Sequence, residues 1–334
     1  MSEINSGVSD ENINGNGSVN GIFAFFNRIL SAYFHISVTG VLCGTLSPFW
    51  WVFEVLSSFR VNYTVGLLIG FSANLIKRKY LNAFLCLAIF SVNGYPLLPY
   101  LYSENLVLNQ NFSKTVKLAG INVHSSNKQH DLVLNYIASK KPDIAVFTEI
   151  NDRWLENLKK LEAEYPYFIA LPRPDNFGIA AYSRIRPQKL EIKYFSNGGL
   201  PSVLMTFEAG SGTVTLLGTH PLPPRTSEYT IGRNIQMNSI MDLFSGISSR
   251  KIVIGDLNTP PWVDLFQKLL ATGGFKDSSL GRGVHATWPV EAWWLFGIPI
   301  DHCLISHDLS VIDRAVGPDL GSDHFPVFVE LGIP

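Results

Sequence analysis

Near its C-terminal end the chain reads Gly321-Ser322-Asp323-His324-Phe325-Pro326-Val327, and further upstream it reads Ile254-Gly255-Asp256-Leu257-Asn258. An adjacent Asp and His at a strand entry can serve one reaction centre, because the carboxylate holds a divalent cation while the imidazole takes a proton from water. An Asp and an Asn two apart on a strand end point to the same side. One can hold metal or polarise the nucleophile while the other donates its amide to a phosphate oxygen. The two stretches together predict the halves of a metal-assisted phosphoesterase site.

Further polar residues stand at the ends of apolar, strand-like runs. They are Asn122 after the run from Val116, Glu149 after Asp143–Val146, His220 after Val214–Leu217, and Asp301 after Ile300. Rigid strands fix the geometry of such a site, and the loops leave it open. Each residue alone is more often a turn former or a cap. Turn chemistry does not place carboxylates and imidazoles in this order, however, so the set favours a catalytic site.

The ordered set Asn, Glu, His, Asp-x-Asn, Asp and Asp-His resembles the endonuclease/exonuclease/phosphatase superfamily. Its members include DNase I, abasic-site endonucleases, neutral sphingomyelinases and inositol polyphosphate 5-phosphatases. The resemblance runs from about Val116 to Leu331, the C-terminal two thirds of the chain. It implies an α/β fold, a four-layer α/β/β/α sandwich of the DNase I type, and a magnesium-dependent phosphoric ester hydrolase.

The resemblance also implies roles in proton transfer and phosphate binding. His324 resembles the general base, and Asp301 resembles the carboxylate that orients it. Asp256 and Asn258 look like the pair that orients the nucleophile and grips the scissile phosphate. His220 resembles the imidazole that stabilises charge on the phosphoryl oxygens or helps the leaving group.

The remaining implied roles concern the metal. Glu149 resembles the main Mg²⁺ ligand, and Asn122 beside it shapes the metal and phosphate pocket. Asp323 is similar to an additional ligand, and Asp256 offers a further hard oxygen for Mg²⁺, with Mn²⁺ as the alternative. His124 points to the same face as Asn122, and the sequence leaves its role open.

A cysteine nucleophile is disfavoured. Cys303 is the one cysteine of the C-terminal two thirds, and it lies inside the strand-like run Ile300–Ile305. A small apolar residue in that place is typical of a buried core position.

The N-terminal third differs in composition. The chain is 46% hydrophobic with a mean hydropathy of +0.16, and this excess lies within residues 34–102. We expect a disordered polar tail over 1–33, three transmembrane helices over 34–102, a tether over 103–115 and the catalytic domain over 116–334. The expected spans are His35–Ser57, Val61–Ile76 and Tyr80–Tyr102. A buried helical subdomain would instead need polar helices to cover it, and none is evident in the sequence.

Basic residues predict the topology of this multi-pass membrane protein. Lys77-Arg78-Lys79 joins the second and third expected spans. The positive-inside rule makes this loop cytoplasmic and the catalytic domain extracytoplasmic. Glu54 is expected at a membrane interface near Trp50 and Trp51.

The substrate is less constrained. Residues 103–334 carry 21 Lys and Arg against 23 Asp and Glu, which weakens a DNA-binding role unless basic residues gather locally. The candidates for such a cluster are Arg184, Arg225, Arg233 and Arg282. The aromatic tract Trp288–Gly297 either forms a platform for an acyl chain, a base or the bilayer, or packs under a loop.

Three function classes therefore stay open. The leading one is a membrane-anchored phosphoesterase acting on a lipid headgroup or small phosphoester. The others are an extracytoplasmic nuclease and a non-catalytic binding protein that retains the fold. The lipid bilayer and the phosphoester are the expected partners, and no motif indicates an obligate protein partner.

Hydrophobic periodicity predicts the elements of the C-terminal region. Strands are expected at 116–123, 143–149, 166–172, 177–183, 189–195, 202–208, 213–219, 251–256, 299–305, 309–315 and 325–331. Helices are expected at 127–140, 152–164, 227–246 and 261–272.

Overall fold

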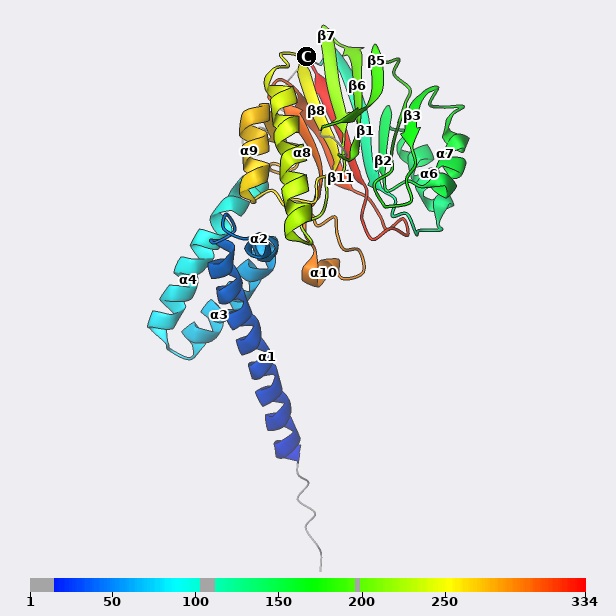
Figure 1. Cartoon of the computed structure of the whole chain (residues 1–334). Coiled ribbons are helices and arrows are strands. Elements are labelled where there is room, and N and C mark those ends of the chain that lie inside the picture. Colours follow the sequence, from blue (N-terminus) through cyan, green and yellow to red (C-terminus); the bar gives the residue numbers. More distant parts are fainter. Residues whose placement is uncertain (1–14, 103–111, 196–198) are drawn as a thin grey trace, which may run out of the picture.

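Two six-stranded sheets pack face to face in the computed structural model, which describes residues 15–102, 112–195 and 199–334 (Figure 1). The first sheet has the order β11(Ser310–Val316), β12(Val327–Ile333), β1(Lys114–Asn122), β2(Ile144–Thr148), β4(Ile179–Ser183), β3(Tyr167–Leu171). The second has the order β5(Lys189–Tyr194), β6(Pro201–Ala209), β7(Gly212–Gly218), β8(Arg250–Asp256), β10(Asp301–Ser306), β9(Phe275–Asp277). Both sheets are mixed, because β1 pairs with β2 and β7 pairs with β8 in parallel while the other pairs are antiparallel.

Side-chain alternation along the strands builds the layers. On β1, Val116 and Leu118 lie in the core between the two sheets, whereas Ala119 and Ile121 belong to the cluster on the outer face. That outer cluster includes α6(His130–Lys140) and α7(Asp152–Leu158), and α7 continues as η2(Lys159–Leu161). On the second sheet, α8(Ser227–Ser245) and α9(Asp264–Gly273) take the corresponding place. The result is a sandwich of two sheets with helices on both outer faces.

All eleven predicted strands occur, with each end within two residues of its expected position. Two short elements were not predicted: β9, which has three residues and is too short for a period-2 pattern, and the helix α10(Trp293–Phe296). Helix α6 begins three residues later than expected, at His130. The reason is a turn in which the Asn127 side chain accepts a hydrogen bond from the Gln129 backbone N–H at 2.8 Å.

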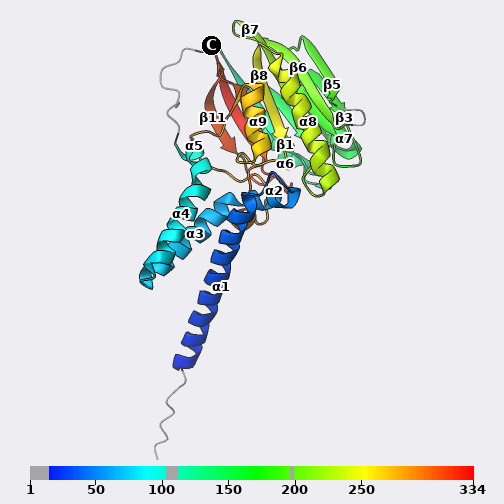
Figure 2. The same ribbon diagram turned by 60° about the vertical axis from the view of Figure 1, so that its left-hand side comes forward.

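The N-terminal region is helical and extends from one end of the sandwich (Figures 1 and 2). It contains α1(Gly15–Gly44), α2(Trp51–Ser57), α3(Arg60–Ile76) and α4(Tyr80–Gly94), which continues through η1(Tyr95–Leu97) into α5(Leu98–Leu101). The polar tail expected over 1–33 is therefore too long, because residues 15–33 belong to α1; residues 1–14 lie outside the described residues. From Ile22 to Thr39 the sequence has no Gly or Pro, so nothing there interrupts a helix.

The three expected membrane spans are not supported. In the described residues, one helical segment, Tyr80–Leu101, is long and apolar enough to cross a bilayer, and α2 with α3 would make a second if this pair, bent by 61°, were one span. The first expected span is divided, because α1 ends at Gly44 and Pro48 lies in the turn before α2. Residues 103–111 of the expected tether lie outside the described residues, and β1 begins at Lys114.

Three parts of the helical region contact the sandwich. Leu97 packs with Trp262 and Val263 in a small apolar cluster. The backbone carbonyls of Pro99 and Tyr100 accept hydrogen bonds from Gly281 and Gly283 at 3.0 and 2.7 Å. The third contact is the bend between α2 and α3, which reaches the end of the sandwich where the strands carry the candidate site residues.

Candidate active site

The predicted site residues meet where strands of both sheets end. Asn122 ends β1 and Glu149 follows β2 in the first sheet, while Asp256 ends β8 and Asp301 begins β10 in the second. Gly218 allows the sheets to approach at this end, since a Cβ there would lie 2.8 Å from the Val146 side chain. The next strand needs a glycine for a related reason. At Gly255, φ is 143° and a Cβ would lie 2.2 Å from the Thr219 carbonyl oxygen.

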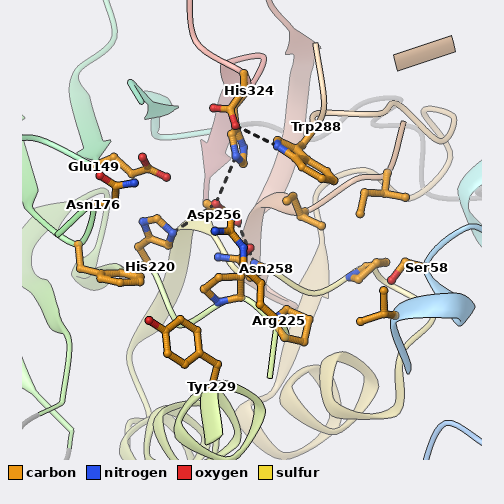
Figure 3. Close-up of a pocket in the computed structure, with 18 of the residues that line it drawn as sticks. Ser58, Glu149, Asn176, His220, Arg225, Tyr229, Asp256, Asn258, Trp288 and His324 are labelled. Atoms are coloured by element: carbon orange, nitrogen blue, oxygen red, sulfur yellow. Dashed lines mark hydrogen bonds and ion pairs between the residues drawn. The ribbon is translucent and has the colours of Figure 1, made fainter. Parts of the chain in front are cut away.

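The centre of the site is a buried group of two carboxylates and one imidazole. Ligand atoms of Asp256, Asp301 and His324 lie within 4.8 Å of one another. The β8–β10 pairing sets Asp301 opposite Asp256. His324 Nδ1 is 2.8 Å from Asp301 Oδ2. The Nε2 atom of His324 lies 3.7 Å from Asp256 Oδ2 (Figure 3). Because Nδ1 faces Asp301, Nε2 is directed at the centre of the site.

Burial and charge shift the pKa values of this group. Burial lowers the pKa of His324, but the facing Asp301 and Asp256 carboxylates outweigh it and raise that pKa to about 10. Burial raises the pKa of Asp256, and Asp301 adds to this, so it reaches about 8 even though the His324 cation opposes the rise. The negative charges are thus only partly compensated by protein groups.

A single amide joins the carboxylates of the two sheets. Asn122 Nδ2 donates to Glu149 Oε1 at 3.0 Å and to Asp256 Oδ2 at 3.2 Å. Its Oδ1 accepts the backbone N–H of His124 at 3.0 Å, which fixes the orientation of the amide. Glu149 has φ of 61°, in the left-handed region that non-glycine residues seldom occupy. Burial raises the pKa of its carboxyl.

His220 and Asn258 both lie beside Asp256 in the site. His220 Nε2 lies 3.4 Å from Asp256 Oδ2. Burial, helped by the nearby His324 charge, lowers its pKa to about 3, so this imidazole is neutral at pH 7. Asn258 has φ of 49°, its backbone N–H donates to Asp256 Oδ1 at 2.8 Å, and its Nδ2 donates to the Pro221 carbonyl at 3.0 Å. One N–H of that amide remains for a ligand.

Asp323 lies at the opposite edge. Trp288 Nε1 donates to its Oδ2 at 3.1 Å, and His124 Nδ1 lies 3.6 Å from its Oδ1. His124, whose role the sequence leaves open, therefore lies beside Asp323. A cavity of about 410 Å³ includes Glu149, His220, Asp256, Asn258, Asp323 and His324 in its lining.

Comparison with known protein families identifies the family of this chain. The model of the endonuclease/exonuclease/phosphatase family matches residues 119–324. The chain belongs to this family. No curated protein sequence matches the chain significantly.

Several solved structures share the fold. Humanized D. rerio TDP2 is 17% identical with a TM-score of 0.54, covering 65% of this chain and 99% of that one. D. rerio TDP2 complexed with single strand DNA product is 18% identical with a TM-score of 0.53, covering 66% and 100%. A family member from Beutenbergia cavernae is 17% identical with a TM-score of 0.55, covering 66% and 72%. None of the three extends over the whole of this chain.

The residues present fit a divalent cation. The Glu149 carboxyl is partly buried and the Asp256 carboxyl is fully buried; both have raised pKa values, and one amide lies between them. The Oδ1 atom of Asp323 is buried and accepts no hydrogen bond from the described residues. Uncompensated carboxylate oxygens are the ligands that Mg²⁺ prefers. Cys303 is buried in the core of β10, as expected, and takes no part in the site.

Two expectations about the surroundings change. The four arginines do not cluster: Arg184 pairs with Glu164, Arg282 donates to the Val311 carbonyl, and Arg233 is fully buried. Only Arg225 of the four lines the cavity. In the aromatic tract, Trp288 lines the cavity, whereas Trp293 and Trp294 of α10 are exposed.

Sequence reasoning missed one wall of the cavity altogether. Val55, Ser58 and Phe59 line it, and they come from the end of α2 and the bend that follows it. Val55 falls in the first expected membrane span, and Ser58 and Phe59 fall between the first and second expected spans. No sequence pattern pointed them toward the site.

Proposed function

We propose that the chain is a divalent-metal-dependent phosphoester hydrolase in which a water molecule attacks the phosphorus in line with the leaving group. The observation that carries this proposal is the buried His324, held at Nδ1 by Asp301 and facing Asp256 through Nε2. A carboxylate-oriented imidazole of this kind is suited to take a proton from water. Family membership supports the same reaction class.

Mg²⁺ is the proposed cofactor. Glu149, Asp256 and Asp323 would hold it, and when bound it would neutralise charge on the non-bridging phosphate oxygens. Asn122 presents its N–H groups to the carboxylates, so we assign it to positioning Glu149 and Asp256. This refines the ligand role that the resemblance implied for its side chain.

The other side chains act on protons and on the phosphate. His324 accepts the proton of the attacking water at Nε2, and Asp301 keeps the Nδ1–H in place and balances the imidazolium that forms. A cation held by Asp256 would neutralise that carboxylate, and the pKa of His324 would then fall from about 10 toward the working range of a base. Neutral His220 and the free N–H of Asn258 donate to phosphoryl oxygens.

We further propose that the helical region anchors the enzyme in a membrane. The α3–α4 pair extends away from the sandwich, with exposed Lys77, Arg78 and Lys79 at its far end (Figure 1). Segment Tyr80–Leu101 has the length and composition of a span. The positive-inside rule then sets the basic loop in the cytoplasm and the catalytic domain, from about residue 116 onward, outside it.

A nuclease is the second candidate. It is favoured by the likeness to D. rerio TDP2, which was solved with a single strand DNA product. It is disfavoured by the shortage of basic residues at the site, since most phosphate contacts in nucleic-acid complexes come from Lys and Arg. The first candidate therefore remains the leading one.

The test is hydrolysis by the full chain in detergent with Mg²⁺, offering bis(p-nitrophenyl) phosphate, p-nitrophenyl phosphate and a labelled single-stranded oligonucleotide in parallel. We expect turnover of a phosphoester that is lost in EDTA, restored by Mg²⁺ and abolished by Glu149→Gln. A control substitution is Glu228→Gln, an exposed glutamate in the first turn of α8. Unchanged activity in EDTA would overturn the metal role. The absence of turnover on every substrate would favour a binding protein.

A further inference from the structure

The bend between α2 and α3 belongs to the same cavity as the catalytic residues. Val55, Ser58 and Phe59 line it together with Asp256 and His324. Figure 3 shows Ser58 on the ribbon of the helical region, across the cavity from Glu149. We call the segment Val55–Phe59 the elbow. The N-terminal helices thus supply part of the catalytic pocket itself.

Strong contacts flank the elbow on both sides and hold it there. Before it, Glu54 forms two short contacts to Arg233 of α8, at 2.6 and 2.9 Å. Within it, the Ser57 carbonyl accepts the Trp262 indole N–H at 2.8 Å, and after it, Asn62 donates to the Leu295 carbonyl at 2.5 Å. Because these partners come from three separate parts of the sandwich, the elbow has a fixed position beside the site.

The Arg233 guanidinium also connects the elbow to the catalytic loop. It is fully buried, and its Nη1 lies 3.5 Å from the Asn258 carbonyl. Glu54, expected at a membrane interface, instead neutralises this buried arginine. The Arg233 side chain therefore contacts both Glu54 of α2 and the loop that carries Asn258.

The cavity has charged lining residues on the sandwich and mainly apolar ones on the elbow. Its charged lining residues, Glu149, Asp256 and Asp323 among them, all come from the sandwich. The elbow adds Val55, Phe59 and one hydroxyl to the lining, which also includes Ile298 and Ile300. Phe59 also meets the ring of Phe296 edge to face, with centroids 6.4 Å apart. A volume of about 410 Å³ lies within the range of about 300–1,000 Å³ typical of sites that enclose a small molecule.

We propose that the elbow is a specificity wall that seats the alkyl part of a phosphoester while the charged end of the cavity holds its phosphate. This inference rests on the proposed function for the phosphate end, and it adds the substrate class: phosphoesters of apolar alcohols. Phe59 and Val55 determine specificity through contact with the alkyl group. They take no part in the chemical step.

The test uses methyl, butyl and hexyl phosphate, which share one phosphate head, as competitive inhibitors of the Mg²⁺-loaded full chain. Each methylene that enters an apolar pocket is worth up to about a 4-fold gain in affinity. We expect the inhibition constant to fall at least about 10-fold from methyl to butyl phosphate in the unaltered chain. In Phe59→Ala and Val55→Asn this gain should shrink to about 2-fold or less, with the methyl phosphate constant unchanged.

Phe49→Ala is the matched control. Phe49 is an exposed phenylalanine of the same helical region and is not among the lining residues of the cavity. It should keep the full chain-length dependence. Equal affinity for the three esters in the unaltered chain, or an unaltered dependence in both elbow variants, would overturn the inference. Val55→Asn decides the case if Phe59→Ala does not fold.

Calorimetric binding of the same esters separates this inference from the proposed function. If affinity depends on chain length but no turnover occurs, the result would support alkyl binding at the elbow and refute the proposed hydrolase activity. Turnover without chain-length dependence would support the hydrolase activity and refute alkyl binding at the elbow. A final arm adds phosphatidylcholine vesicles with or without phosphatidic acid as competitors. Competition specific to phosphatidic acid identifies a lipid as the source of the alkyl phosphate, and competition by the soluble esters alone identifies a soluble ester.

Discussion

Replacing Asp301 by Asn tests the proton-transfer assignment most directly. The bond from His324 Nδ1 to Asp301 Oδ2 is 2.8 Å long and both side chains are buried. Hydrogen bonds to charged groups contribute about 1.5–3 kcal/mol, which corresponds to about a 10- to 150-fold loss of kcat when the carboxylate is removed. An Asn in that place can also donate to Nδ1, which would move the imidazole proton to Nε2 and block it as a base.

The expected loss of kcat is larger when the general base His324 itself is removed. His324→Ala should lower kcat by about 10²- to 10⁴-fold, the usual contribution of a general base. The double variant should be little slower than His324→Ala alone, because the two residues act as one unit. The assay is initial-rate hydrolysis of the best phosphoester at saturating Mg²⁺, with circular dichroism to confirm folding.

A matched control exists in the same sheet. Asp277 and His302 form a second buried acid–imidazole pair, 3.7 Å apart, in which His302 alternates to the other face of β10. Asp277→Asn should affect stability without altering the pH profile of kcat. The reasoning is refuted if the losses from Asp301→Asn and His324→Ala multiply, or if His324→Ala retains near-normal rates.

Three further predictions concern charge and topology. In EDTA, the melting temperature of the chain should fall as pH rises from about 6 to 9. The reason is that folding raises the pKa of the Asp256 carboxyl to about 8. Such a carboxyl stabilises the folded state fully at pH values below its pKa in the unfolded chain, and this stabilisation is lost as pH rises through its pKa in the folded chain. A flat profile in a thermal scan contradicts this. Glu54→Ala should lower the free energy of unfolding by about 3–5 kcal/mol, because it leaves Arg233 buried and unpaired. The double variant Glu54→Leu with Arg233→Met should regain most of this stability, as measured by denaturant unfolding. Equal losses of stability in the two variants would argue against the ion pair. A reporter fused after Pro334 should be active outside the cytoplasm, and cytoplasmic activity would reverse the proposed topology.

The sandwich was predictable because its strands are bounded by turn residues and its buried faces repeat with a clear period. The site could be proposed for a related reason, since Asn122, Glu149 and Asp256 stand at or directly after strand ends, and His324 lies in the turn before β12. The N-terminal region was not predictable in the same way. Apolar composition alone does not distinguish a span from a helix that packs on a neighbouring domain, and the Glu54–Arg233 contact joins residues far apart in the chain. Long-range pairings of this kind leave no local pattern.

The register of β8 and β10 has a consequence for how this protein can diverge. Asp301 lies opposite Asp256 and His302 lies opposite Gly255. Inserting or deleting one residue in β10 would exchange the faces of Asp301 and His302, turning the carboxylate toward Phe266, which now packs on the His302 ring. A change of strand length at this point would therefore disrupt the Asp301–His324 pair. The exposed Trp293 and Trp294 of α10 carry no such register constraint, so these two positions can change without disturbing that pair.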